Sequence, residues 1–521
     1  PPSADEILPK TGNRISPKQF PDSLPGRFSE GLSGQHLPAQ KLPAGKVSAS
    51  VGFRTLFRGG IKIIKGEMIM EIKEKINELT DEMLDKVARL VRYDSQLAPA
   101  KPGMPFGEGP AMALAEGLKI AGELGFETRN LDNYCGYAEI GEGKDIIGIV
   151  GHLDVVPAGE GWSSDPFKME VRDGYMYGRG VIDDKGPVIA SMYAMKLVKE
   201  AGVPLNKRIR LIMGCNEETG SLCMKHYNEV AEPVTIGFTP DGGFPGIHGE
   251  KGKMDMMVYS KNTKIISMEG GFVSNAVCSR CTTVIPEGEI EISELEKALA
   301  KTPLTDFSVK AEGGSVTIYA IGTAAHASNP LLGVNAASYT MKALCDAGFT
   351  DDFADFYISH IGTGCDGAGY GLDISDEYGR LSFNNGIVKT ENGVIMCDID
   401  IRYPVTFTEE KLRELCAPYL EDEKGRTEIT WIGPSLFYPA DSDLVRELYE
   451  SYVEVTKDTE HKPVVIGGGT YAKSIKGIIA FGAEYPGKDY HMHDADERHS
   501  IEDFKTTVEI YVNAIRKLLA V

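Results

Sequence analysis

The chain has 521 residues, of which 42% are hydrophobic and 25% are charged, and its formal net charge is −21 at pH 7. This size and composition fit a folded protein with one large or two ordinary hydrophobic cores. The negative charge argues against nucleic acid or an anionic membrane surface as a partner, because both attract clusters of Lys and Arg. No apolar run approaches the roughly 20 residues that span a bilayer.

Residues 1–67 differ in composition from the rest of the chain. They hold 8 of the 28 prolines and 10 Lys and Arg against 5 Asp and Glu, whereas the remainder carries 45 basic and 71 acidic residues. With its weak periodicity, this segment is predicted to be a disordered leader. It contains no methionine, so we interpret it as translated upstream DNA and expect the native start at Met68 or Met70. A genuine flexible extension or a basic presequence is the alternative.

Hydrophobic periodicity predicts the elements that follow. Apolar residues at helical spacing from Met70 onward predict two amphipathic helices, with Thr80 in the position of a cap, and a further helix is predicted over residues 188–198. Short apolar runs predict buried strands at residues 146–150, 209–213, 234–238 and 478–481. Strands that alternate with helices predict an α/β catalytic domain with a central, mostly parallel mixed sheet flanked by helices.

The pattern changes between residues 253 and 437. Strand-like runs at 315–320 and 394–402 surround a turn at 322–326 and a predicted helix at 335–347. We therefore expect an inserted α+β domain over residues 253–437, with the catalytic domain formed by residues 68–252 and 438–521.

Nine cysteines are scattered along the chain without an apolar signal segment near its start, which favours reduced thiols and a cytoplasmic location. Cys278 and Cys281 form a single C-x-x-C motif. A structural zinc ion needs four ligands and no second pair follows, so both are interpreted as unpaired thiols.

Acidic residues and histidines gather at the ends of the predicted strands, where open α/β sheets bind their ligands. In chain order these residues are His152, Asp154, Glu217, Glu218, Asp241 and His493. Asp183 precedes the predicted helix at residues 188–198 and is expected at its N-terminus, where partial positive charge favours a carboxylate. Each of these short motifs is common by chance, and the prediction rests on their combination.

Five carboxylates in one cleft would raise one another's pKa until some bind protons or a cation arrives. Two divalent ions would solve this problem, with one carboxylate bridging them. Two imidazoles and three carboxylates suit zinc first, with manganese or cobalt as alternatives, and disfavour calcium.

At these residues the sequence resembles the aminoacylase and carboxypeptidase G family of two-metal peptidases, and most closely its dipeptidase V branch (PepV, Xaa-His dipeptidase). The resemblance covers residues 70–521. Further motifs that resemble this branch are residues 177–187 (YGRGVIDDKGP), Phe244-Pro245, residues 467–472 (GGGTYA) and Tyr485-Pro486-Gly487.

The resemblance implies five metal ligands, with His152 and Asp241 on one ion, Glu218 and His493 on the other, and Asp183 bridging both. Asp184 would not be the bridge, and the spacing to the following acidic residues selects His493 over His491. Glu217 would be the general base that moves a proton from metal-bound water to the leaving amine. Asp154 would support catalysis by fixing the metal-binding tautomer of His152.

The resemblance also implies substrate-binding residues, several of them in the inserted domain, which would act as a lid. His326 and Asn275 would stabilise the tetrahedral oxyanion, Arg402 would clamp the free carboxylate of the substrate, and Gly468 would contact the substrate. A plain turn histidine and a structural salt bridge are the alternatives for His326 and Arg402. The sequence around Asn275 departs from the pattern of the branch. Because the enlarged lid of this branch supplies its histidine within one chain, we expect a monomer.

The predicted function is that of a two-metal dipeptidase acting on small peptides with free amino and carboxyl ends, Xaa-His and β-alanyl dipeptides among the candidates. A hydroxide between the ions would be the nucleophile. An N-acyl amino acid deacylase or a carboxypeptidase of the same family is the alternative. A non-catalytic metal-binding or peptide-binding protein would be expected if the base were missing, but Glu217 is present.

Overall fold

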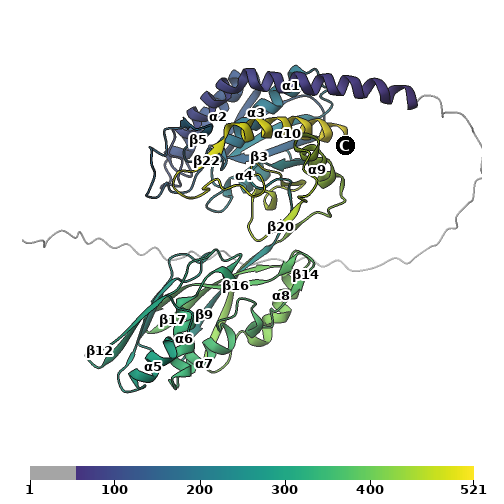
Figure 1. Ribbon diagram of the computed structural model, residues 1–521. Helices are drawn as coiled ribbons and strands as arrows, with labels where there is room; N and C mark the ends of the chain where they lie inside the picture. The colour runs from purple at the N-terminus through teal and green to yellow at the C-terminus, as the bar shows by residue number, and fades with distance from the viewer. Residues whose placement is uncertain (1–53) are drawn as a thin grey trace, which may run out of the picture. The chain divides into compact units, whose positions relative to one another are not determined.

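The computed structural model describes the backbone of residues 54–521 and the side chains from residue 71 onward (Figure 1). The leader predicted for residues 1–67 lies outside the described residues up to residue 53, and its end belongs to helix α1 (Arg54–Val91). The prediction of two amphipathic helices here was wrong, because α1 is continuous through Thr80. The hydroxyl of Thr80 donates to the carbonyl oxygen of Ile76 at 2.9 Å. This bond lies inside the helix, so Thr80 is not a helix cap.

The first sheet has nine strands in the order β1-β2-β6-β3-β7-β21-β8-β19, with β20 paired to β8. Their bounds are β1 Glu127–Leu131, β2 Cys135–Ile140, β3 Ile146–His152, β6 Arg208–Gly214, β7 Ile236–Thr239, β8 Ile247–Glu250, β19 Leu436–Phe437, β20 Val464–Ile466 and β21 Ile478–Ala480. The predicted α/β class and its four apolar strands are confirmed. The sheet is parallel at its centre, from β6 through β3 and β7 to β21.

Toward both edges the sheet is less parallel than predicted. The pairs β1–β2, β2–β6, β21–β8 and β8–β19 are antiparallel, and only β20 adds a parallel pairing at an edge. A short loop suffices to join the antiparallel pair β1–β2, whereas a parallel pair needs a long crossover. The sheet is therefore mixed, with its parallel part where the predicted strand ends lie.

Helices cover the first sheet. Helices α3 (Lys185–Glu200) and α10 (Ile501–Ala520) lie side by side over β3 (Figure 1). All seven residues of β3 are buried, so the sheet is covered on both faces here. The remaining helices of this part are α2 (Glu108–Glu123), α4 (Leu222–Val230) and α9 (Asp443–Thr456). A small sheet joins β4 (Glu170–Arg172), β5 (Tyr175–Tyr177) and β22 (Arg498–Ser500).

A second sheet lies in the chain between β8 and β19. Its eight strands are antiparallel throughout, in the order β12-β13-β11-β10-β16-β17-β9-β18. Their bounds are β9 Gly252–Ser260, β10 Ser267–Gly270, β11 Arg280–Pro286, β12 Asp306–Glu312, β13 Ser315–Ile321, β16 Ser382–Glu391, β17 Val394–Tyr403 and β18 Gly425–Gly433. The strands and the helix predicted at 315–320, 394–402 and 335–347 are confirmed.

The second sheet has a hydrophobic core of its own. Along β9, buried and half-buried residues alternate, so one face of the sheet packs into this core. The helices of this part are α5 (Ile292–Leu299), α6 (Ala336–Asp346), α7 (Asp352–His360) and α8 (Glu409–Cys416), and a short hairpin joins β14 (Ser375–Asp376) to β15 (Gly379–Arg380). Cys278 and Cys281 are buried free thiols, as predicted. Among the described residues, no helix is long and apolar enough to cross a membrane.

Candidate metal centre

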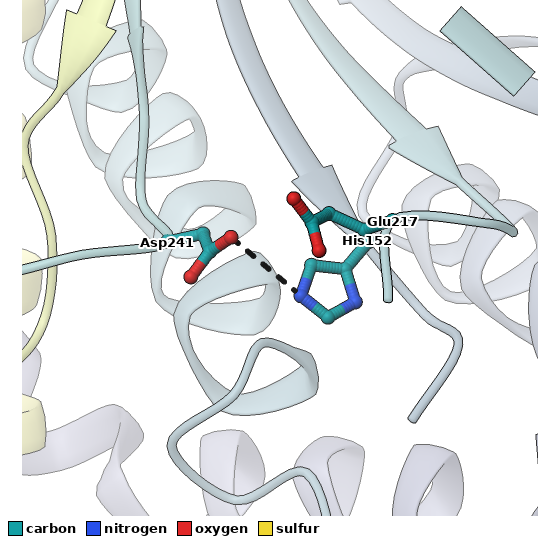
Figure 2. Close-up of side chains that lie close together, drawn as sticks. All are labelled: His152, Glu217 and Asp241. Carbon is teal, nitrogen blue, oxygen red and sulfur yellow. Dashed lines mark ion pairs between the residues drawn. The ribbon is translucent and has the colours of Figure 1, made fainter. Parts of the chain in front are cut away.

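The predicted ligands meet at one edge of the first sheet. His152 is the last residue of β3, Glu217 and Glu218 follow the end of β6, and Asp241 follows the end of β7. These three strands are parallel neighbours, so their carboxyl ends lie together. Figure 2 shows His152, Glu217 and Asp241 turned toward one another.

Asp183 lies between the two histidines. Its Oδ1 is 2.9 Å from Nε2 of His152, and its Oδ2 is 2.8 Å from Nε2 of His493. Nε2 of His152 is 3.9 Å from Oδ2 of Asp241, and Nε2 of His493 is 3.5 Å from Oε1 of Glu218. One oxygen of Asp183 therefore faces each histidine, the arrangement expected of a bridging carboxylate.

The donor set fits two divalent ions. The ligand atoms of His152, Asp183 and Glu218 lie within 4.8 Å of one another, and so do ligand atoms of His152, Glu217 and Asp241. Oε1 of Glu218 is buried and makes no hydrogen bond within the described part of the chain. A buried carboxylate oxygen without a donor is costly unless a cation pairs with it. Imidazole and carboxylate together suit a borderline metal such as zinc, manganese or cobalt.

Burial and repulsion shape the electrostatics of these acids. Burial, followed by the charge of Asp183, raises the pKa of Asp241 to about 8. Burial and the charge of Asp241 raise the pKa of Glu217 above its usual range. Burial would also raise the pKa of Asp183, but hydrogen bonds with His152 and His493 outweigh it and lower that pKa. The imidazoles of His152 and His493 thus stabilise the ionised form of Asp183, as a pair of cations would.

Asp154 lies beside His152 and beside both glutamates, and its predicted role at His152 stays a prediction. Nδ1 of His152 lies 2.9 Å from the backbone carbonyl oxygen of Asp154, and the carboxylate Oδ1 is farther away at 3.5 Å. The carboxylate instead accepts hydrogen bonds from the backbone N–H groups of Glu217 at 3.0 Å and Glu218 at 3.1 Å. It therefore fixes the turn that carries both glutamates, while its carbonyl is placed to set the tautomer of His152.

Glu497 and Arg179 also belong to the site, although sequence reasoning gave them no role. The carboxylate of Glu497 is fully buried and accepts the backbone N–H groups of Gly180 and Ile182 at 3.0 Å and of Asp183 at 3.3 Å. Arg179 donates to it at 2.7 Å. Arg179 stands inside the quoted motif of residues 177–187, and Glu497 is one of the acidic residues that follow His493, which was the available signal. Glu497 therefore holds the loop that presents Asp183.

Two neighbouring candidates have other partners. Oδ2 of Asp184 accepts the backbone N–H of His152 at 3.1 Å, so this carboxylate lies beneath β3. Nδ1 of His491 is 3.2 Å from the carbonyl oxygen of Ala495, and its Nε2 is 3.2 Å from Asp489. Among the described residues, the two groups whose ligand atoms all lie within 4.8 Å contain neither residue, and they do not contain His493 either, although Nε2 of His493 contacts Asp183 and Glu218.

The predicted substrate residue Gly468 belongs to a glycine loop, residues 467–469, that follows β20, and Arg402 contacts this loop. Arg402 pairs with both carboxylate oxygens of Asp400, at 2.7 and 2.9 Å, which is the structural role weighed as its alternative. Its Nη1 also donates to the carbonyl oxygen of Gly467 at 3.4 Å, next to Gly468. The clamp role of Arg402 and the contact of Gly468 with substrate stay predictions.

His326 is exposed and lies on a loop beside Asn275. The backbone N–H of Ala327 donates to the carbonyl oxygen of Asn275 at 2.9 Å, and His326 pairs with Ala276 in an isolated bridge. Burial of part of the ring and the charge of Arg402 lower the pKa of His326, with a smaller contribution from His493. The structure thus brings Asn275 and His326 together, and their oxyanion roles stay predictions.

The carboxylate of Glu217 makes no hydrogen bond or ion pair with any described residue, and it lies beside a candidate set of metal ligands. Metal-dependent hydrolases use such an arrangement to activate water, and this is the class of protein that the fold and the site indicate. Comparison of the sequence with known protein families identifies the kind of hydrolase. The chain belongs to Peptidase family M20/M25/M40, whose sequence profile matches residues 148–517, and it is therefore a metallopeptidase. This confirms the expected family, whereas the dipeptidase V branch stays a prediction.

Individual relatives agree with this assignment. The chain is 36% identical over 434 residues to "Putative dipeptidase YtjP" of Bacillus subtilis (strain 168), covering 80% of this chain and 93% of that protein. It is 31% identical over 465 residues to a "Putative dipeptidase" of Staphylococcus aureus (strain USA300), covering 86% and 99%.

Two solved structures share the fold. Human carnosine dipeptidase 1 has a TM-score of 0.51 at 15% identity, over 87% of this chain and 99% of that one. A tripeptidase from Staphylococcus aureus has a TM-score of 0.51 at 16% identity, over 85% and 98%. At these identities the similarity shows the mixed α/β fold alone.

Proposed function

We propose that the protein is a dipeptidase of the dipeptidase V branch, acting on dipeptides with free amino and carboxyl ends. The observation that carries the proposal is that the adjacent residues Glu217 and Glu218 have different surroundings. Glu218 lies beside Asp183 and His493, whereas the carboxylate of Glu217 makes no hydrogen bond or ion pair with any described residue. The dipeptidase names of the two bacterial relatives support the choice of substrate.

Each residue of the site has a defined task in this proposal. His152 and Asp241 would hold one divalent ion, Glu218 and His493 the other, and Asp183 both. When bound, the ions would polarise the scissile carbonyl and lower the pKa of water. Glu217 takes the proton of the attacking water and delivers it to the leaving amine. Zinc is the first choice of metal, with manganese and cobalt as alternatives.

The second sheet and its helices form the proposed lid, residues 253–437, over a catalytic domain of residues 68–252 and 438–521. Its separate core supports this division. His326 and Asn275 would donate to the oxyanion, and Arg402 and Gly468 would bind the carboxyl end of the substrate. A Cβ added to Gly467 would lie 2.6 Å from Cβ of Ser328, so the His326 loop reaches the glycine loop within one chain, which supports a monomer. The nine free cysteines support a cytoplasmic location.

Replacing the proposed base tests the assignment. Glu217→Gln should retain two metal ions per chain, because Glu217 is not a ligand, while kcat falls by about 10²- to 10⁴-fold, the usual contribution of a general base. Elemental analysis and steady-state kinetics measure both quantities, with Asp132→Asn as a control for the loss of an exposed carboxylate. A kcat within a few-fold of the wild type would exclude Glu217 as the base.

A substrate panel tests the reaction. Xaa-His, β-alanyl and other dipeptides should be cleaved, and their N-acetylated forms should be poor substrates. Preference for N-acylated amino acids would instead identify a deacylase, and release of single residues from longer peptides would identify a carboxypeptidase.

A further inference from the structure

Glu484 lies between two of the segments that carry the proposed ligands. It follows β21 at the same edge of the sheet, and its backbone N–H donates to the carbonyl oxygen of Gly242 at 3.2 Å. Its own carbonyl oxygen accepts the N–H of Phe244 at 2.7 Å, which ties it to the loop of Asp241. On the other side, Ala483 packs in one small cluster with Ile182, the residue before Asp183.

The carboxylate of Glu484 has no partner in the part of the chain whose side chains the structure describes. It is half-buried, yet among residues 71–521 it forms no hydrogen bond and no ion pair. Two other acids of the site are paired, Asp183 with two imidazoles and Asp154 with two backbone N–H groups. Burial and the charge of Asp183 raise the pKa of Glu484 to about 7, and its charge in turn acts on Asp241. Its charge is therefore felt at the ligand cluster.

The net charge of the ligand cluster indicates which kind of group Glu484 could bind. Asp154, Asp183, Glu217, Glu218 and Asp241 carry five negative charges when all are ionised, and two divalent ions balance four of them. Glu484 adds a sixth carboxylate at the edge of the cluster, so the site retains an attraction for one more cation. A dipeptide brings such a cation, because its ammonium group lies only a few bonds from the scissile carbonyl. An N-acylated amino acid does not.

We propose that Glu484 binds the free amino group of the substrate and thereby selects dipeptides over N-acylated amino acids. This inference rests on the proposed dipeptidase function and adds a specificity-determining residue to it. An ammonium group paired with a carboxylate in a partly buried site forms a charge-assisted hydrogen bond, which is stronger than a neutral one. Glu484 would then replace the water around the ammonium group when the peptide enters.

The test compares two substrates that differ only in the amino group, alanyl-alanine and propionyl-alanine. Wild-type protein should prefer alanyl-alanine. In Glu484→Gln and Glu484→Leu, KM for alanyl-alanine should rise about 10- to 100-fold, the value of one hydrogen bond to a charged group, with KM for propionyl-alanine unchanged. Asp489→Asn removes a 74% exposed carboxylate from the same loop and should change neither KM. Metal content should stay at two ions per chain in all variants.

Three results would overturn the proposal. KM for alanyl-alanine could be unchanged in both Glu484 variants, or KM could rise equally for the two substrates, or metal could be lost, which would make Glu484 a ligand. The proposed function fails separately, if wild-type protein cleaves propionyl-alanine at least as well as alanyl-alanine. In that case the wild-type data alone reject a dipeptidase, before any variant is considered.

Discussion

Protons on Asp241 and His493 link the charge of the site to metal binding. The pKa of Asp241 is raised from 3.8 to about 8 by burial and the charge of Asp183, and that of His493 from 6.5 to about 11 by its hydrogen bond with Asp183 and by the nearby carboxylate of Glu218. Between pH 6 and 8, Asp241 binds a proton in the folded protein but not in the unfolded chain, and His493 does so increasingly above pH 6.5. The free energy of unfolding of metal-free protein therefore falls as pH rises in this window. Asp183, with its lowered pKa, is ionised in both states and adds no slope.

Metal binding must displace these protons, so its stabilising effect should grow with pH. We expect the rise in Tm on adding Mn²⁺ to chelator-treated protein to be larger at pH 8 than at pH 6. Differential scanning calorimetry at fixed ionic strength and several pH values measures it. The variant Asp241→Asn should show a weaker pH dependence, because one of the displaced protons is missing. An equal or smaller rise in Tm at pH 8 would contradict the assigned ligands.

The loop between β5 and α3 shows how an element is fixed by a residue far away in sequence. Glu497 stands just before β22, and its carboxylate accepts N–H groups from the Asp183 loop, 314 residues earlier at the nearest. The ion pair with Arg179 is buried on both sides, at 1% and 0% exposure. Removing one partner of such a pair leaves the other charge buried and unpaired.

We therefore expect Glu497→Gln to lower the free energy of unfolding by about 3–5 kcal/mol and to weaken metal binding through Asp183. Denaturant unfolding and metal titration measure the two effects. A double variant, Arg179→Met with Glu497→Leu, should recover part of the stability, because no buried charge remains. Unchanged stability in Glu497→Gln would show that this pair does not hold the loop.

The elements that carry the proposed ligands could be predicted from sequence, because buried strands produce apolar runs and the proposed ligands stand at the ends of those runs. The ends of β3, β6 and β7 were placed in this way. The partners of Glu497 and Asp154 could not be predicted, because they are backbone N–H groups, which leave no trace in the residue types. Glu484 carries no apolar or metal-binding pattern either. The pairing of Arg402 with Asp400 was foreseeable, since residues two apart on a strand share a face.

Across the whole molecule, two sheets with separate cores are joined by two short crossings of the chain. One runs from β8 to β9 through Lys251, and the other from β18 to β19. A third link involves Gly467, which follows β20. Its carbonyl oxygen accepts a hydrogen bond from Arg402, and it lies against Ser328, which is two residues from His326. The glycine loop therefore joins the sheet that holds the ligands to the part proposed as a lid.

A side chain at Gly467 should disturb this contact without affecting the metals. A Cβ there would lie 2.6 Å from Cβ of Ser328, so Gly467→Ala must displace the His326 loop. We expect kcat/KM to fall about 10- to 100-fold, because catalytic donors tolerate little misplacement, with metal content unchanged. Gly122→Ala is the matched control, since a Cβ at Gly122 meets nothing within 4 Å. Normal kcat/KM in Gly467→Ala would show that this contact plays no part in catalysis.

The central claim is that one carboxylate, Asp183, joins two metal ions at the end of the first sheet. Anomalous diffraction from crystals grown with zinc or manganese tests it directly. The account predicts two peaks about 3.5–4 Å apart, one within reach of His152 and Asp241 and the other of Glu218 and His493, with an oxygen of Asp183 on each. A single peak, or ions bound away from these five side chains, would contradict it.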